Sequence, residues 1–370
     1  MTMQIAGRIV TPDGIVDDGH VTVDGPLIAS VGSGPVIGRP ERAAWVLPGF
    51  VDIHNHGGGG HTFTTGDPDS ARAAAAFHRR HGTTTVIASL VSSPPALMRD
   101  ATAAFLPLVR EGVLGGVHYE GPYLSGARCG AQNPDFLRDP DLDELAALID
   151  LGDGAVRMMT IAPELPGALD AIKLLASHGV AAAVGHTDAS HGATRAAVEA
   201  GATVATHLFN GMRPVHHREP GPVLALLDSP GVVCEVVADG VHLHDGTLAF
   251  VAGAARGGYA LVTDAMAAAG MPDGAYELGG LSVVVADRVA RLASNGSIAG
   301  STLTMDAAVR QAVGAGVSIV DASRAASGTP ARAVGLSGTV GAIVPGLRAD
   351  LVLLDEQLQV TGVVHAGVFQ

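Results

Sequence analysis

Lysine and cysteine are scarce in this sequence of 370 residues. It contains one lysine, Lys173, and two cysteines, Cys129 and Cys234. The cysteines are far apart and form no CxxC pair, which argues against a thiolate metal site and a disulfide framework; a single disulfide is the weaker alternative. The N-terminal stretch MTMQIAGRIV shows no signal-peptide pattern. We therefore expect free thiols and a cytoplasmic location.

Positive charge is also scarce. The chain has 22 Lys and Arg residues against 36 Asp and Glu residues, a net charge of −14. An acidic surface repels phosphate backbones, so we expect no nucleic-acid partner, although one or two arginines could still bind a small anion. No uninterrupted apolar run approaches the roughly 18 residues of a membrane helix, so we expect no membrane partner.

The two ends of the chain resemble each other in pattern. Residues 1–48 and 336–370 both contain short alternating segments separated by turn residues, as is typical of small all-β units. Neither end is long enough to bury a core alone. We therefore predict a small β-sandwich domain built from both termini.

The middle, residues 49–335, alternates short apolar segments with Ala- and Leu-rich helical stretches. The helical stretches include SARAAAAFHRRHG and ALDAIKLLASHG, which end in glycine, a common helix-ending residue. The eight predicted strands are GFVDIH, TTTVIAS, VLGGVHYE, VRMMTIA, VAAAVGH, TVATH, VVCEVVAD and YALVTD. This alternation predicts an α/β fold, a (β/α)8 TIM barrel, rather than an open sheet with a GxGxxG turn, which we do not find.

Residues able to bind metal stand at the ends of five of these strands. In such a barrel the active site lies at the carboxyl ends of the strands. His54 and His56 are two apart and should face the same way. A lone histidine at a strand end is more often structural, but six such residues together predict a metal centre: His54, His56, Glu120, His186, His207 and Asp264.

Nitrogen and carboxylate ligands suit Zn²⁺ first, with Fe²⁺, Co²⁺, Mn²⁺ or Cd²⁺ as alternatives. We expect one ion at Glu120, His186 and His207. A second could be held by His54 and His56, with Glu120 or Asp264 shared. A metal-bound hydroxide would attack an amide-like carbonyl, with Asp264 as the general base and then the acid. His118 is expected to support the ligands rather than bind metal.

Several segments together resemble the N-acetylglucosamine-6-phosphate deacetylases of the amidohydrolase superfamily. They are PGFVDIHNHGGGG, HYEGPYL, GHTDA, THLFNGM followed by REPG, ADGVHL, VTDAM and IAGST. Related enzymes that bridge two metals with a carboxylated lysine are disfavoured, because Lys173 lies in a helical pattern. Glu120 resembles the replacement for that lysine.

The resemblance implies hydrolysis of N-acetyl-D-glucosamine 6-phosphate to D-glucosamine 6-phosphate and acetate. It implies a homodimer in which Arg218 reaches the phosphate in the neighbouring site. The sequence departs from many members in carrying Gln132 at a position where they have a phosphate-binding histidine. The implied substrate-binding residues are Ala131, Gln132, Asn210, Gly211, Arg218, His242, Ile298, Ala299, Gly300 and Ser301.

The sequence leaves three alternative functions open. The substrate could be the epimer N-acetylgalactosamine 6-phosphate, since one hydroxyl orientation cannot be derived from these motifs. A metal-dependent deaminase is disfavoured, because no glutamate follows His186 or His207 in the expected HxxE spacing. A non-catalytic barrel would be expected to have lost metal ligands, and all six are present. Cys129, in the loop after Glu120, is expected to be an incidental thiol.

Overall fold

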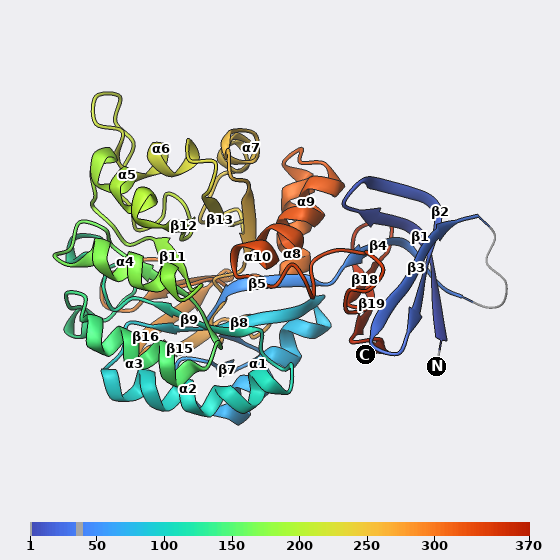
Figure 1. The fold of residues 1–370 in the computed structure, drawn as a ribbon, viewed down its shortest axis with the longest axis horizontal. Coiled ribbons are helices and arrows are strands. Elements are labelled where there is room, and N and C mark those ends of the chain that lie inside the picture. Colours follow the sequence, from blue (N-terminus) through green and yellow to red (C-terminus); the bar gives the residue numbers. More distant parts are fainter. Residues whose placement is uncertain (1, 35–39) are drawn as a thin grey trace.

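The computed structural model describes residues 2–34 and 40–370, so Met1 and residues 35–39 of the predicted terminal domain lie outside the described part. A barrel with helices around it forms one end of the molecule, and a separate sheet forms the other (Figure 1). Strands from both ends of the described chain form that sheet. No helix in the described part of the chain has the length and apolar character needed to cross a membrane.

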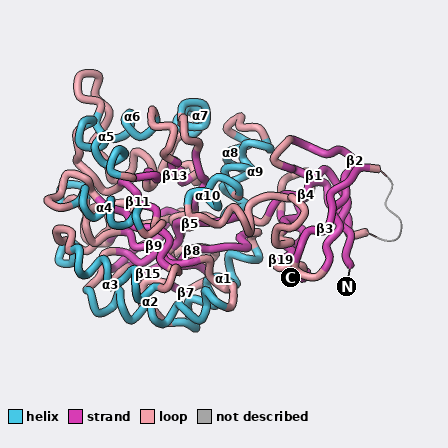
Figure 2. Tube along the Cα trace, in the orientation of Figure 1, coloured by secondary structure: helices cyan, strands magenta, loops and turns pink. Residues whose placement is uncertain are grey.

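Eight parallel strands form the barrel, and all eight coincide with segments predicted from sequence. Their spatial order follows the chain order, each strand pairing with the next. Every one of them is almost wholly buried. Helices cover the outside of the barrel (Figure 2), and the side chains of the strands fill its inside. The strands are β5 (Phe50–Asn55), β8 (Thr83–Val91), β9 (Gly116–Glu120), β10 (Val156–Ile161), β11 (Ala181–Val184), β12 (Ala202–Ala205), β13 (Val233–Val237) and β14 (Tyr259–Val262).

A helix follows each strand, which confirms the predicted (β/α)8 fold. The helices are α1 (Pro68–Arg80), α2 (Pro95–Arg110), α3 (Leu142–Gly152), α4 (Ala168–Ser177), α5 (His191–Ala200), α6 (Gly221–Leu227), α7 (Asp245–Ala254), α8 (Met305–Gly314), α9 (Ile319–Ala326) and α10 (Gly328–Ala333). Local sequence sets their ends. Asp67 accepts a hydrogen bond from the amide of Asp69 at the start of α1, and Gly201 ends α5 in a left-handed conformation.

The terminal strands form one seven-stranded sheet, in the spatial order β20-β19-β18-β4-β1-β2-β3. Alternation along the strands gives it two apolar faces: Val46 packs into the sheet's own core, and the next residue, Leu47, packs into the barrel core. The strands are β1 (Thr2–Thr11), β2 (Gly14–Asp24), β3 (Leu27–Ser33), β4 (Glu41–Pro48), β18 (Leu351–Leu354), β19 (Val360–His365) and β20 (Val368–Phe369).

An antiparallel insertion interrupts the barrel pattern between the eighth strand and α8. It consists of β15 (Gly274–Leu278), β16 (Leu281–Ala286) and β17 (Val289–Leu292), and it was not predicted from the sequence. Its buried side chains pack against Val91 at the end of β8 and against Met266. The insertion therefore lies over the carboxyl ends of the barrel strands. A smaller hairpin, β6 (Gly57–Gly58) and β7 (His61–Thr62), follows β5.

Hydrogen bonds between β5 and the residues after β14 close the barrel. The amide of Asp264 donates to the carbonyl of His54 over 2.9 Å, and the amide of His56 donates to the carbonyl of Ala265 over 2.7 Å. Below them the buried Asp52 carboxylate accepts from the hydroxyl of Thr263 over 2.6 Å and from its amide over 3.2 Å. The closure thus joins the segment of His54 and His56 to that of Asp264.

We predict that Thr263→Val destabilises this closure. Valine has the shape of threonine but can neither donate to Asp52 nor accept from Asn55 and the Ala265 amide. The loss of a donor by the buried carboxylate alone costs about 1–3 kcal/mol. The free energy of unfolding in urea measures the effect. Thr194→Val is the matched control, because the Thr194 hydroxyl is also buried but donates only to the Ser190 carbonyl of its own helix, over 3.0 Å. Equal losses in the two variants would contradict a special role for the Asp52 contact.

Candidate metal centre

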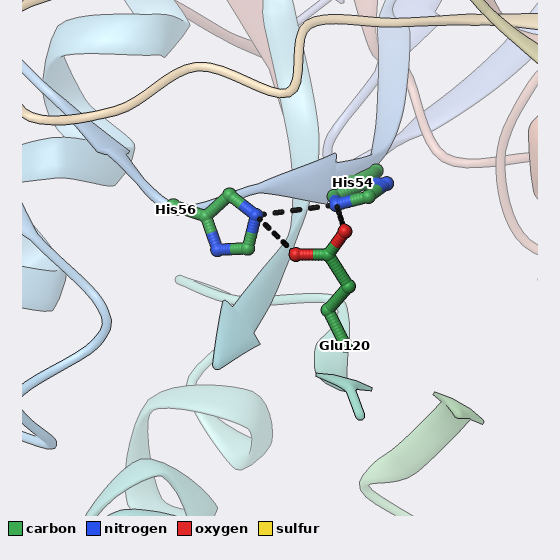
Figure 3. Close-up of side chains that lie close together, drawn as sticks. All are labelled: His54, His56 and Glu120. Carbon is green, nitrogen blue, oxygen red and sulfur yellow. Dashed lines mark hydrogen bonds and ion pairs between the residues drawn. The ribbon is translucent and has the colours of Figure 1, made fainter. Parts of the chain in front are cut away.

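The six predicted metal residues meet at the carboxyl ends of the barrel strands. Five of them form two groups of three, and within each group the ligand atoms lie within 4.8 Å of one another. One group is His54, His56 and Glu120; the other is Glu120, His186 and His207. All five residues are buried. Figure 3 shows Glu120 from β9 pointing between the two histidines of the β5 segment.

Glu120 belongs to both groups, and its Oε1 faces both, since it also lies 3.6 Å from His54 Nε2. Its Oε1 lies 2.9 Å from His186 Nε2 and 3.0 Å from His207 Nε2. Its Oε2 lies 3.2 Å from His56 Nε2. A carboxylate placed in this way can ligate one ion or link two.

Asp264 lies beside the pair on β5. Its Oδ1 is 3.2 Å from His56 Nε2 and 3.5 Å from His54 Nε2. Its Oδ2 is 4.0 Å from Nε2 of His242. Burial alone would raise the pKa of Asp264, but the adjacent His54 and His56 lower it to about 2, so the carboxylate is ionised.

Left-handed backbone conformations place three of the six residues. His186, His207 and Asp264 have φ of 45°, 25° and 49°, respectively. Each stands two positions after the last residue of its strand, at the point where the chain turns out of the barrel. Such φ values are unfavourable for residues other than glycine and cost about 1–3 kcal/mol, so surrounding contacts must hold them.

Glycines leave room for the ring of His186. A Cβ atom on Gly130 would lie 3.1 Å from His186 Cε1, and one on Gly211 would lie 3.0 Å from His186 Nδ1. Both glycines also have φ near +60°, where other residues are strained: 60° for Gly130 and 61° for Gly211. The GARCGAQ and FNGM segments therefore need glycine at these points.

The outer nitrogen of each ligand histidine has an acceptor, which leaves the inner nitrogen free for metal. Nδ1 of His56 lies 3.1 Å from the Ser89 carbonyl, that of His186 lies 2.9 Å from the Arg128 carbonyl, and that of His207 lies 3.1 Å from the Asn210 carbonyl. Nδ1 of His54 differs: it lies 3.0 Å from the carboxylate Oε2 of Glu235.

Electrostatics favour a cation at this centre. Burial would lower the pKa of His54, yet the carboxylates of Glu235, Asp264 and Glu120 raise it well above its ordinary value. Burial opposes protonation of His56 as well, but Asp264 and Glu120 raise its pKa to about 9. The carboxylates therefore stabilise positive charge, which a divalent ion would supply in place of protons. The buried oxygen and imidazole ligands fit such an ion.

His118 was expected to support the ligands rather than bind metal, and both of its ring nitrogens face hydroxyl groups. Its Nδ1 lies 2.9 Å from the Ser89 hydroxyl and its Nε2 lies 2.9 Å from the Thr160 hydroxyl. Burial and the neighbouring His54 lower the pKa of His118 well below its ordinary value, so the ring is neutral.

A cavity of about 240 Å³ opens above the ligands. Seven of the ten residues assigned to the substrate by resemblance line it: Ala131, Gln132, Asn210, Gly211, His242, Ile298 and Gly300. The insertion adds Leu278 to the wall. Neither this residue nor its strand, β15, was predicted, although the alternating segment LSVVVA of the next strand was a visible signal.

The other three assigned residues lie elsewhere. Ala299 is fully buried in the core of the insertion. Ser301 is buried and donates from its hydroxyl to the Thr263 carbonyl over 2.6 Å, so it supports the Asp264 segment. Arg218 is exposed, with its guanidinium 2.8 Å from the ring of His217.

Gln132 lines the cavity, but both ends of its side chain are engaged. Its Nε2 donates to Glu120 Oε2 over 2.7 Å, and its Oε1 accepts from the amide of Ser92 over 2.7 Å. Cys129, in the same loop, is half-buried and donates to the Gln132 carbonyl over 3.0 Å. Both cysteines are free thiols, as predicted.

Comparison with known proteins places this site in a family. The amidohydrolase family model matches residues 45–369. An N-acetylgalactosamine-6-phosphate deacetylase of Escherichia coli O157:H7 is 37% identical over 360 residues, covering 96% of this chain and 95% of that protein. An N-acetylglucosamine-6-phosphate deacetylase of Bacillus subtilis (strain 168) is 34% identical over 377 residues, covering 97% of this chain and 94% of that protein.

Solved structures agree with these relatives. A mutant N-acetyl-D-glucosamine-6-phosphate deacetylase of Mycobacterium smegmatis, solved in complex with N-acetyl-D-glucosamine-6-phosphate, is 43% identical. It superposes with a TM-score of 0.96 over 100% of this chain and 99% of that chain. The chain therefore belongs to the metal-dependent amidohydrolase family and, within it, to the N-acetylglucosamine-6-phosphate deacetylase family.

Proposed function

We propose that this protein hydrolyses N-acetyl-D-glucosamine 6-phosphate to D-glucosamine 6-phosphate and acetate. The observation that carries the proposal is the Glu120 centre: two buried ligand groups share one carboxylate, with the ionised Asp264 beside them, at the base of a cavity. The relatives named for this reaction support the choice of substrate.

A bound divalent ion would polarise the acetamide carbonyl and lower the pKa of water at the site. We propose Zn²⁺, held by Glu120, His186 and His207, with a second ion at His54 and His56. Asp264 accepts the proton of the attacking water and returns it to the departing amine, as general base and then general acid. Its low pKa, about 2, keeps it ionised, which is the form that a general base needs.

We propose that His242 contacts the substrate beside Asp264. Its Nδ1 lies 2.7 Å from Asp239 Oδ2, so the ring is fixed with Nε2 toward the cavity. Burial would lower the pKa of His242, but Asp239 raises it, which favours an N–H that donates to a substrate oxygen.

We propose that Asn210 and Gly211, which line the cavity, contact the sugar, and that Arg218 of a second subunit contacts the phosphate in a homodimer. Gln132 is a weaker candidate for a phosphate contact than its position in the motif suggested, because its amide group already donates to Glu120. A cytoplasmic location is part of the same proposal.

N-acetylgalactosamine 6-phosphate is the second candidate substrate, because one of the relatives is named for it. The two sugars differ in the orientation of one hydroxyl group. Contacts to that hydroxyl would decide between them, and a hydrogen bond lost on the wrong epimer costs about 1–3 kcal/mol.

Acetate release from the purified protein tests the reaction. We expect turnover of N-acetylglucosamine 6-phosphate, a lower kcat/KM for the galacto epimer, and little activity on the unphosphorylated sugar. A higher kcat/KM for the galacto epimer would favour the second candidate. Removal of metal by a chelator should abolish turnover, and added Zn²⁺ should restore it. An enzyme that releases no acetate from any of the three sugars would contradict the proposal.

Asp264→Asn tests the proton transfer. Asparagine keeps the size of the side chain but cannot accept the proton, so kcat should fall by about 10²–10⁴-fold. Metals per chain, measured by elemental analysis, should show that the Glu120, His186 and His207 ion remains. Turnover near that of the unchanged protein would rule out Asp264 as the base.

Gln132→Met tests whether this side chain acts on Glu120 or on the phosphate. Methionine is similar in size but donates nothing to Glu120, so metal affinity in chelator competition should fall by about 10-fold or more. Asn133→Ala is the control from the same loop, since Asn133 only caps the amide of Asp135. A large rise in KM with unchanged metal affinity would instead support the phosphate contact.

A further inference from the structure

Glu235 is a buried carboxylate that the proposed reaction does not use. It lies in the middle of β13, is 0% exposed, and points into the barrel rather than into the cavity wall. Neighbours in its strand are apolar: Cys234 and Val236. An ionised carboxylate in such a place is costly unless specific donors surround it, so its contacts indicate why it is there.

One oxygen of Glu235 connects the two candidate metal groups. Its Oε2 lies 3.0 Å from Nδ1 of His54 and accepts from the backbone amide of His207 over 3.1 Å. His54 belongs to the group with His56, and His207 belongs to the group with His186. The other oxygen, Oε1, is buried without a hydrogen-bond partner among the described residues.

The contact distinguishes His54 from the other ligand histidines. The outer nitrogens of His56, His186 and His207 face neutral backbone carbonyls, whereas that of His54 faces a full negative charge. A carboxylate behind a ligand histidine fixes the ring with its inner nitrogen toward the metal and strengthens that nitrogen as a donor. His54 is therefore the histidine whose ligation depends most on another side chain.

The negative charge of the buried carboxylates also favours a second metal ion. Glu120, Asp264 and Glu235 contribute three negative charges and lie 3.6, 3.5 and 3.0 Å, respectively, from the ring nitrogens of His54. A single divalent ion supplies two positive charges and leaves a buried excess of negative charge, whereas a second ion removes it. Buried carboxylates are stable where cations balance them.

From these contacts we propose that Glu235 is the positioning residue of a second metal ion, bound at His54 and His56. It holds the His54 ring through Nδ1 and supplies the negative charge that the second ion balances. The inference rests on the metal centre of the proposed function but not on its substrate, so metal binding tests it without any turnover.

Glu235→Gln removes the negative charge of this side chain but keeps its size and its hydrogen-bond acceptor. The glutamine oxygen can accept from both His54 Nδ1 and the His207 amide, while the charge is lost. We expect the metal-free variant to melt within a few degrees of the unchanged protein. After reconstitution with Zn²⁺ and removal of free metal, the unchanged chain should hold two ions, and Glu235→Gln should hold one. In chelator competition the weaker ion should lose about 10–100-fold in affinity.

His54→Asn identifies the ion that is lost. Because Glu235 acts through His54, adding Glu235→Gln to His54→Asn should change metal content and affinity no further. Co²⁺ absorption provides a spectroscopic check, since both single variants should lose the same band. Asp239→Asn is the matched control: it makes the same change behind His242, which lies outside both ligand groups, and should leave the count at two.

Several results would overturn the proposal. These are a single ion in the unchanged chain, two ions of unchanged affinity in Glu235→Gln, and equal weakening of both ions. The last would show that Glu235 acts through the His207 backbone instead of through His54. A chain that binds two ions as expected but releases no acetate would contradict the proposed function alone and leave the role of Glu235 standing.

Discussion

The carboxylate of Glu120 is the interaction on which the centre depends. It is buried, and four imidazoles from three other strand ends approach its two oxygens. Without a cation, such a group is tolerable only when the histidines carry protons, as the raised pKa values of His54, His56 and His186 indicate. A metal ion would balance the carboxylate charge in the same way and with fixed geometry. The site therefore favours a bound cation even without substrate.

Barrel closure supplies the geometry that Glu120 requires. His54, His56 and Asp264 come from the first and last strands of the barrel, more than two hundred residues apart in the chain, and become neighbours because β5 bonds to the residues after β14. The Asp52–Thr263 contact lies directly beneath them. The stability of the fold and the placement of the ligands therefore rest on the same few hydrogen bonds.

Backbone strain at the site is offset by contacts that also serve the chemistry. His207 has an unfavourable φ, and its amide is held by Glu235, which also orients His54. Asp264 has the same kind of conformation, and its amide and carbonyl are held by His54 and Ser301. Groups that do not line the cavity thus hold the backbone of His207 and Asp264, which do.

The sequence by itself determined the barrel, its eight strands and the six residues at their ends, because strand burial and strand-end chemistry are local patterns. It also indicated the terminal sheet and the family. Only the tertiary structure decided that Gln132 donates to Glu120, that Ser301 braces the Asp264 segment, and that β15–β17 wall the cavity. The role of Glu235 could not be predicted from the sequence either. A glutamate within a strand carries no local signal, and its role depends on contacts with residues distant in the chain, which form only when the barrel closes.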